Sequence, residues 1–300
     1  MAEKKHRKKI PRGYQGYIFI LPWLIGVIWF QVYPFLSSFY LSFTDKSVSD
    51  NVNFIGVQNF VRIFTVDPDF LAVVKATIVY TLIASPGKVF FALIIALILN
   101  ADIKGVNVFR TIYYLPSIFG GSIAISVIWR FLFENAGYIN MLLQKCGMEP
   151  LKWFGNTHLA PFTIALVAIW QFGSSMVLFL AALKNVPREL YEAAEVDGGN
   201  KLKVFFAVTL PMISPILLFN LVMQTINSFQ EFTTPFVLTQ GGPNKATLLF
   251  GMKLYREAFQ NFNMGYASAY SWILFAILIV VTLFIFLTSQ YWVFYGDEKK

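Results

Sequence analysis

The chain has 300 residues, of which 57% are hydrophobic and only 13% are charged. Soluble domains carry about 25% charged residues, so this chain has too few charges to cover a water-exposed surface. Composition therefore excludes an ordinary soluble domain and favours a membrane protein. In a soluble protein the net charge of +8 would suggest nucleic acid as a partner. No nucleic-acid partner is expected here, because basic residues gather on the inner side of membrane proteins.

Long stretches without Asp, Glu, Lys or Arg recur along the chain. They cover 13–44, 111–129, 153–183, 204–230 and 258–296, and a further stretch, 76–101, contains only Lys88. A membrane-spanning helix needs about 20 apolar residues, so each stretch can form one. Very apolar core helices of a soluble protein are the alternative, but such helices rarely stay uncharged for so long.

The predicted fold is an all-α membrane protein with six transmembrane helices. A single transmembrane domain, 14–295, is expected between a basic tail, 1–13, and a short tail, 296–300. The helices are predicted at about 14–41, 72–100, 111–133, 161–183, 205–229 and 266–291.

The N-terminus is basic and then apolar, as in a secretory signal. No small-residue cleavage site follows, and the apolar run exceeds a signal core, so it is interpreted as a retained first span. If the N-terminus is inside and six helices alternate, the inner segments hold most of the Lys and Arg residues. Both termini are therefore expected in the cytoplasm, with the chain multi-pass in the plasma membrane.

Residues for catalysis or metal binding are scarce. Cys146 is the only cysteine, which rules out an intrachain disulfide, and His6 and His158 lack partners at metal-ligand spacing. Gly87-Lys88 lacks the upstream glycine of a phosphate-binding G-x-x-x-x-G-K-[ST] motif. No metal site and no catalytic residue is predicted, so the chain is not expected to be an enzyme. Asp67 and Asp69 are interpreted as solvated loop residues.

One polar stretch between the predicted spans looks helical. Pro187 suits a first helical turn, acidic residues near the start suit the helix dipole, and Gly198 suits the end. A short, exposed, acidic helix is thus predicted at about 187–198, on the cytoplasmic side. A helix lying on the bilayer is the alternative, but such helices are usually basic. A protein partner is favoured.

This stretch resembles the EAA loop of bacterial importer permeases. The matching residues are Glu192-Ala-Ala-Glu-Val-Asp-Gly198, Phe205, Val208-Thr-Leu-Pro211 and Pro215. Other segments resemble the carbohydrate-uptake branch, of the glycerol-phosphate and multiple-sugar type: Ile20–Gly26, Tyr33-Pro34, Ser42–Thr44, Phe54–Gly56, Asn59-Phe60, Phe109–Thr111, Leu115-Pro116, Thr239–Pro243, Tyr255–Phe259 and Gly265–Ala267. The family pattern usually has Ala at position 199 and Asn at 76, where this chain has Gly199 and Ala76.

The resemblance implies a type I ABC importer permease with a cytoplasmic coupling helix. Expected partners are a second, homologous permease in a heterodimer, two ATPase subunits that bind ATP and Mg, an extracytoplasmic solute-binding protein, and a sugar. No cofactor is expected in this chain. The residues implied in coupling to the ATPase are Glu189, Glu192, Ala193, Ala194, Asp197 and Gly198.

Polar residues inside spans are functional candidates. Two groups could bind sugar hydroxyls beside an aromatic ring: Trp170, Gln171 and Ser174 in the fourth span, and Gln224, Asn227, Ser228 and Glu231 in the fifth. Hydrogen bonding between packed helices is an equally good explanation. Lys88 is expected to snorkel, to pair with an acid on another helix, or to face an aqueous path.

Two rival classes remain. A secondary transporter would need membrane-embedded acids for ion coupling, and a membrane enzyme would need clustered His, Asp or Glu. The predicted spans are nearly free of these residues. The sequence alone does not specify the sugar.

Overall fold

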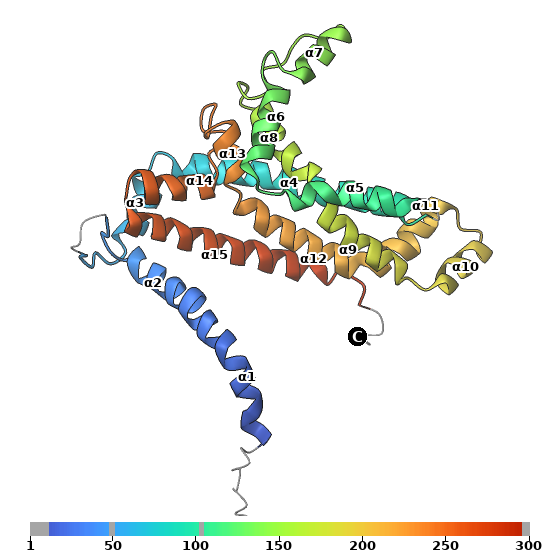
Figure 1. The fold of residues 1–300 in the computed structure, drawn as a ribbon, viewed down its shortest axis with the longest axis horizontal. Helices are drawn as coiled ribbons and strands as arrows, with labels where there is room; N and C mark the ends of the chain where they lie inside the picture. The colour runs from blue at the N-terminus through green and yellow to red at the C-terminus, as the bar shows by residue number, and fades with distance from the viewer. Residues whose placement is uncertain (1–11, 48–51, 102–104, 296–300) are drawn as a thin grey trace, which may run out of the picture.

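The computed structural model describes residues 12–47, 52–101 and 105–295 (Figure 1). In these residues every regular secondary-structure element is a helix, and the one isolated β-bridge pairs Thr44 with Phe54. Four helical stretches are long and apolar enough to cross a membrane, and there are up to six if each of two bent helix pairs counts as one span. An all-helical fold with several apolar spans is therefore confirmed.

The first helical stretch is an arm that leaves the rest of the molecule (Figure 1). It comprises α1 (Arg12–Val27), a π-helical turn η1 (Ile28–Val32) and α2 (Tyr33–Ser42). The arm is held where α2 packs on α15 (Met264–Ser289). There the rings of Phe35 and Phe39 lie 4.8 and 4.6 Å from that of Trp272, whose Nε1 donates to Ser38 Oγ at 3.2 Å.

The main bundle is built around α4 (Phe70–Leu99). It packs against α8 (Leu159–Trp170), α9 (Gly173–Lys184) and α12 (Leu210–Phe229), while α12 also packs on α15. Fully buried Ala92 and Ala96 of α4 face Met176 and Phe179 of α9 in one cluster. Small residues on one helix allow the close approach that membrane helices need, because burial from water does not drive their association.

Two of the predicted spans are bent, which differs from the single helices expected at 111–133 and 161–183. Helix α5 (Val106–Ile118) and the stretch Ile123–Lys145, which begins with α6 (Ile123–Phe133), are bent by 100° to each other, and α8 and α9 are bent by 50°. Gly121 between α5 and α6 has φ +71°, a conformation that glycine adopts at low cost. A Cβ on Gly173 would lie 2.5 Å from Tyr113 O, so glycine lets the α8–α9 joint approach α5.

Shorter helices complete the described chain: α3 (Gln58–Thr65), α7 (Tyr138–Lys145), α10 (Arg188–Val196), α11 (Lys201–Val204), η2 (Phe205–Thr209), α13 (Thr233–Leu238), α14 (Phe250–Tyr255) and η3 (Arg256–Gln260). The end that carries α3 and α14 lies opposite the end that carries α10 (Figure 1). The loop with α7 is organised by buried Asn140. Its Nδ2 donates to Leu151 O at 2.9 Å, and its Oδ1 accepts from Trp153 Nε1 at 3.0 Å.

An ion network ties the loop before α4 to α14, η3 and α15. Lys253 Nζ lies 3.3 Å from Asp67, 2.9 Å from Asp69 and 3.0 Å from Glu257. Asp67 Oδ2 also accepts hydrogen bonds of 2.7 Å from Tyr266 and Tyr270. The expectation that Asp67 and Asp69 are solvated loop residues is wrong for Asp67, whose side chain is 4% exposed. Asp69 is more open and also pairs with Lys245.

Within this network the ionised forms are favoured. Burial opposes the charge on Asp67, but hydrogen bonds from Tyr270, the Asp69 backbone and Tyr266 outweigh it and lower the pKa of Asp67. Burial likewise opposes the charge on Lys253, and hydrogen bonds to Asp69 and Glu257 outweigh it, raising the pKa of Lys253. Each buried charge is paired, which a low-dielectric site requires.

Candidate functional site

Two features hold most of the residues singled out by the sequence: helix α10 and a polar cavity at the helix bends. Helix α10 lies between α9 and α11, at the end of the bundle farthest from α3 (Figure 1). Pro187 occupies its N-cap position and Glu189 lies in its first turn, where acids are favoured by the dipole. Four of the expected coupling residues lie on α10, and Asp197 and Gly198 follow it directly. All six are exposed except Ala194, which is half-buried.

The end of α10 is a Schellman motif. Gly199 N donates to Ala194 O at 2.9 Å and Gly198 N to Glu195 O at 3.0 Å, the two reverse bonds that define the motif. Gly198 has φ +74°, the left-handed conformation that the motif requires. A Cβ on Gly199 would lie 2.7 Å from Ala194 O. Glycine at position 199, where the family pattern usually has Ala, therefore fits the tight turn that ends α10.

The inner side of α10 is joined to the helix that leads into α12. Tyr191 Oη and Thr209 Oγ1 lie 3.2 Å apart, and Thr209 is the last residue of η2, directly before α12. Leu190, Ala193 and Ala194 face Val204 and Val208 across a groove of about 300 Å³. On the other side Val196 is 88% exposed. Helix α10 thus combines a fixed inner side with an open, partly acidic outer side.

The polar cavity lies where the two bent spans meet the end of α12, and its volume is about 420 Å³. It brings together five residues named from the sequence: Lys88, Gln171, Ser174, Asn227 and Glu231. Further residues that complete its lining were not singled out by sequence: Ser117, Gly120, Gly121, Gln230, Phe232 and Thr233. Discontinuous spans are where membrane transporters commonly form binding sites, because broken helices expose backbone groups to a cavity.

Gly120 brings two bent spans into contact beside the cavity. A Cβ at Gly120 would lie 3.1 Å from Gln171 Oε1 and 3.2 Å from Ser117 O. The Gly120-Gly121 pair was a signal in the sequence, because adjacent glycines inside an apolar run mark a break. The single helix predicted over 111–133 does not allow for this break.

The structure does not bring the other predicted residues into this cavity. Trp170 packs against Trp129, with ring centres 5.9 Å apart. Gln224 Nε2 donates to Ser175 Oγ of α9 at 3.2 Å, and Ser228 is buried outside the cavity lining. For Gln224, hydrogen bonding between helices is therefore the contact that the structure shows.

Lys88 is half-buried inside α4 and lines the cavity. Within the described parts of the chain its Nζ forms no hydrogen bond or ion pair, although it shares the cavity with the Glu231 carboxylate. Glu231 Oε1 accepts a hydrogen bond of 2.9 Å from Thr234 N at the start of α13. A lysine at the centre of a span costs about 3 kcal/mol on insertion scales. Lys88 was expected to snorkel, to pair with an acid or to face an aqueous path, and the structure shows it facing a cavity.

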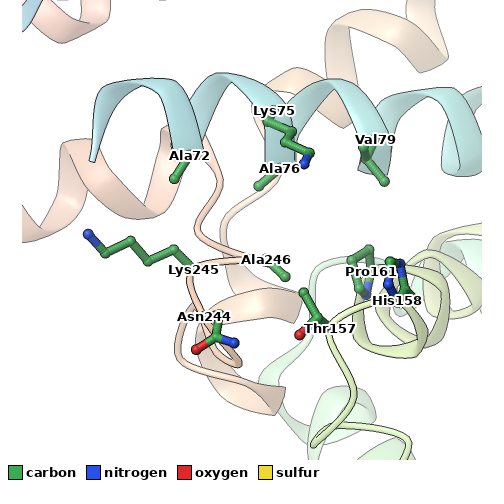
Figure 2. A pocket seen from close by; sticks show the side chains of 10 residues that line it. All are labelled: Ala72, Lys75, Ala76, Val79, Thr157, His158, Pro161, Asn244, Lys245 and Ala246. Carbon is green, nitrogen blue, oxygen red and sulfur yellow. The ribbon is translucent and has the colours of Figure 1, made fainter. Parts of the chain in front are cut away.

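A second cavity, of about 210 Å³, opens between α4, the start of α8 and the loop before α14 (Figure 2). Lys75, Thr157, His158 and Asn244 are its polar lining residues. Lys245 turns away from the others and pairs with Asp69 in the ion network. In the described ranges, no group of three or more His, Cys, Asp or Glu residues could hold a metal ion.

Comparison with known proteins agrees with the architecture. Residues 76–293 match the model of the family described as binding-protein-dependent transport system inner membrane component. The chain belongs to this family and is a membrane-embedded permease component.

Several relatives cover nearly the whole chain. The "Probable ABC transporter permease protein YesP" of Bacillus subtilis is 44% identical, covering 100% of this chain and 98% of the relative. The arabinooligosaccharides transport system permease protein AraP of the same species is 31% identical over 89% of this chain and 86% of its own length. A chain of a bacterial ABC transporter that imports the acidic polysaccharide alginate superposes with a TM-score of 0.80 at 22% identity. That match covers 93% of this chain and 96% of the other, so it shows a shared fold.

Proposed function

We propose that this chain is the permease subunit of an ATP-driven, solute-binding-protein-dependent importer for a sugar or oligosaccharide. It forms half of the translocation path, beside a second homologous permease. Two ATPase subunits bind ATP and Mg on the cytoplasmic side, and both termini of this chain lie there. The sugar assignment is supported by relatives named for arabinooligosaccharides and multiple sugars.

Helix α10 is the proposed coupling element. The observation that carries this role is the joined arrangement of α10 and η2: the Tyr191–Thr209 contact connects an exposed acidic helix to the base of α12. When ATP draws the two ATPase subunits together, a helix seated on one of them moves with it. Because α10 ends in a rigid Schellman turn, that displacement passes to η2 and α12 rather than being absorbed in the loop.

The polar cavity is the proposed substrate path. Amide, hydroxyl and carboxylate groups from Gln171, Ser174, Asn227 and Glu231 supply donors and acceptors for sugar hydroxyls. Phe232 supplies an aromatic face at the same cavity. A cavity of about 420 Å³ has the size of a small-molecule site.

The test is uptake of labelled sugars by cells that lack this chain. Accumulation is expected to be lost in the deletion strain and restored by the wild-type chain. A chain carrying both Glu192→Lys and Gly198→Val is expected to reach the membrane without restoring uptake. Full restoration by this double variant would refute the coupling role, and unchanged uptake in the deletion strain for every sugar tried would refute the import function.

A further inference from the structure

An unpaired cation inside a transport cavity constrains the substrate. Lys88 is one of the few charged residues within the long apolar helices, and α4 places it at the wall of the polar cavity. Charged side chains at such positions are costly, and they are usually paired or functional. In the described residues no hydrogen bond or ion pair satisfies the Lys88 ammonium, which leaves it available to a ligand in the cavity.

The carboxylate in the same cavity does not fill this role. Glu231 attracts Lys88 electrostatically but forms no ion pair with it. One of its oxygens is already held by Thr234 N at 2.9 Å, which ties the carboxylate to the start of α13. The cavity therefore presents an ammonium without an ion pair together with hydrogen-bonding groups for hydroxyls.

We infer that the transported sugar carries a negatively charged group, such as a carboxylate, and that Lys88 binds it. This inference rests on the proposed import function and names its substrate class. The anion completes the coordination of the ammonium, while Gln171, Asn227 and Glu231 bind hydroxyls of the same molecule. A neutral sugar would leave the Lys88 ammonium without a direct ion pair at the moment when the cavity closes around the substrate.

The experiment uses the complete importer in proteoliposomes: this chain, its permease partner, the ATPase subunits and the binding protein. The probes are tritium-labelled uronic-acid disaccharides and their carboxyl-reduced, neutral counterparts. ATP-dependent uptake is measured for the wild type, Lys88→Met and Lys88→Arg. Lys75→Met is the matched control, since Lys75 is an exposed lysine on the same helix, outside this cavity.

Wild-type importer is expected to take up at least one acidic disaccharide in preference to its neutral counterpart. Lys88→Met should lower that uptake by about tenfold, the effect of losing one charge-assisted hydrogen bond. Lys88→Arg should keep most of it, and Lys75→Met should match the wild type. Uptake of neutral sugars alone, or unchanged acidic-sugar uptake by Lys88→Met, would overturn the inference and leave the import function intact. Absence of ATP-dependent uptake of every probe would count against the import function itself.

Discussion

Lys253 Nζ donates to Asp69 Oδ2 at 2.9 Å although the two residues are 184 positions apart in the chain. The contact, together with those to Asp67 and Glu257, locks α14 and η3 to the start of α4. These contacts hold the helices at the α3–α14 end of the bundle together. The end of the bundle opposite α10 is therefore cross-linked by buried ion pairs.

Replacing Lys253 with Met is expected to destabilise the protein by about 3–5 kcal/mol, because it leaves buried carboxylates without their cation. The unfolding temperature of the purified complex in detergent, followed by tryptophan fluorescence, measures this. Lys245→Met is the control: its side chain is 48% exposed, and its loss should cost under about 1 kcal/mol. Equal losses for the two variants would contradict the buried network.

The same network predicts a pH dependence. Folding lowers the pKa values of Asp67 and Asp69. Their contribution to the free energy of unfolding is therefore fully present above the pKa of the unfolded chain, about 3.9, and is lost as pH falls through the pKa values of the folded state. Folding raises the pKa of Lys253. Its contribution to the free energy of unfolding is therefore fully present below the pKa of the unfolded chain, about 10.4, and is lost as pH rises through the pKa of the folded state. Stability from the network should be constant between about pH 5 and 9. Unfolding temperatures measured across this range check it.

Gly198→Ala tests the turn at the end of α10. The left-handed conformation costs a residue with a Cβ about 1–2 kcal/mol, so the last turn of α10 should fray. The expected result is a lower ratio of sugar imported to ATP hydrolysed in the reconstituted complex, with ATP hydrolysis retained. Gly26→Ala is the matched control, since a Cβ there meets nothing within 4 Å and its φ is not positive. An unchanged ratio in Gly198→Ala would show that the turn is not needed for coupling.

Gly120→Leu tests the cavity. The new side chain would displace Gln171, whose Oε1 lies 3.1 Å from the position of a Cβ, and would occupy the space at the bend. Uptake should fall by about tenfold, corresponding to about 1.4 kcal/mol of lost binding, while the amount of assembled complex stays near normal. If uptake persists at the wild-type level, the cavity is not on the substrate path.

The polar contacts between α4, α9 and α12 are expected to have modest energies. Ser85 Oγ and Thr225 Oγ1 lie 3.0 Å apart, between α4 and α12. A double-mutant cycle with Ser85→Ala and Thr225→Val should give a coupling energy of about 0.6 kcal/mol, typical of hydrogen bonds between membrane helices. The free energy of unfolding in mixed micelles measures it, and a coupling of zero would mean that the contact is not stabilising.

Much of the fold follows from the sequence because lipid requires long apolar helices, and uncharged runs reveal them directly. The bends in the α5–α6 and α8–α9 spans were not predicted, since hydropathy does not indicate where a helix changes direction. Gly173 needs to be glycine because of the Tyr113 backbone, a neighbour that only the folded chain supplies. Asp67 was misplaced for the same reason: its tyrosine and lysine partners come from the far end of the sequence.

The candidate site was predictable in part. Spacing identified polar positions inside the spans, and the structure brings Gln171, Ser174, Asn227 and Glu231 to one cavity with Lys88. Spacing could not separate these residues from Gln224, which sits on the same helix as Asn227 but bonds to Ser175. That distinction depends on the rotation of α12 against α9, which is set by packing.

The most direct test of the account is sugar uptake into proteoliposomes that contain this chain and its permease partner, with and without the ATPase subunits and the binding protein. The account predicts accumulation only when all components and ATP are present, and its loss when α10 carries Glu192→Lys and Gly198→Val. Accumulation in the absence of the ATPase subunits would contradict it.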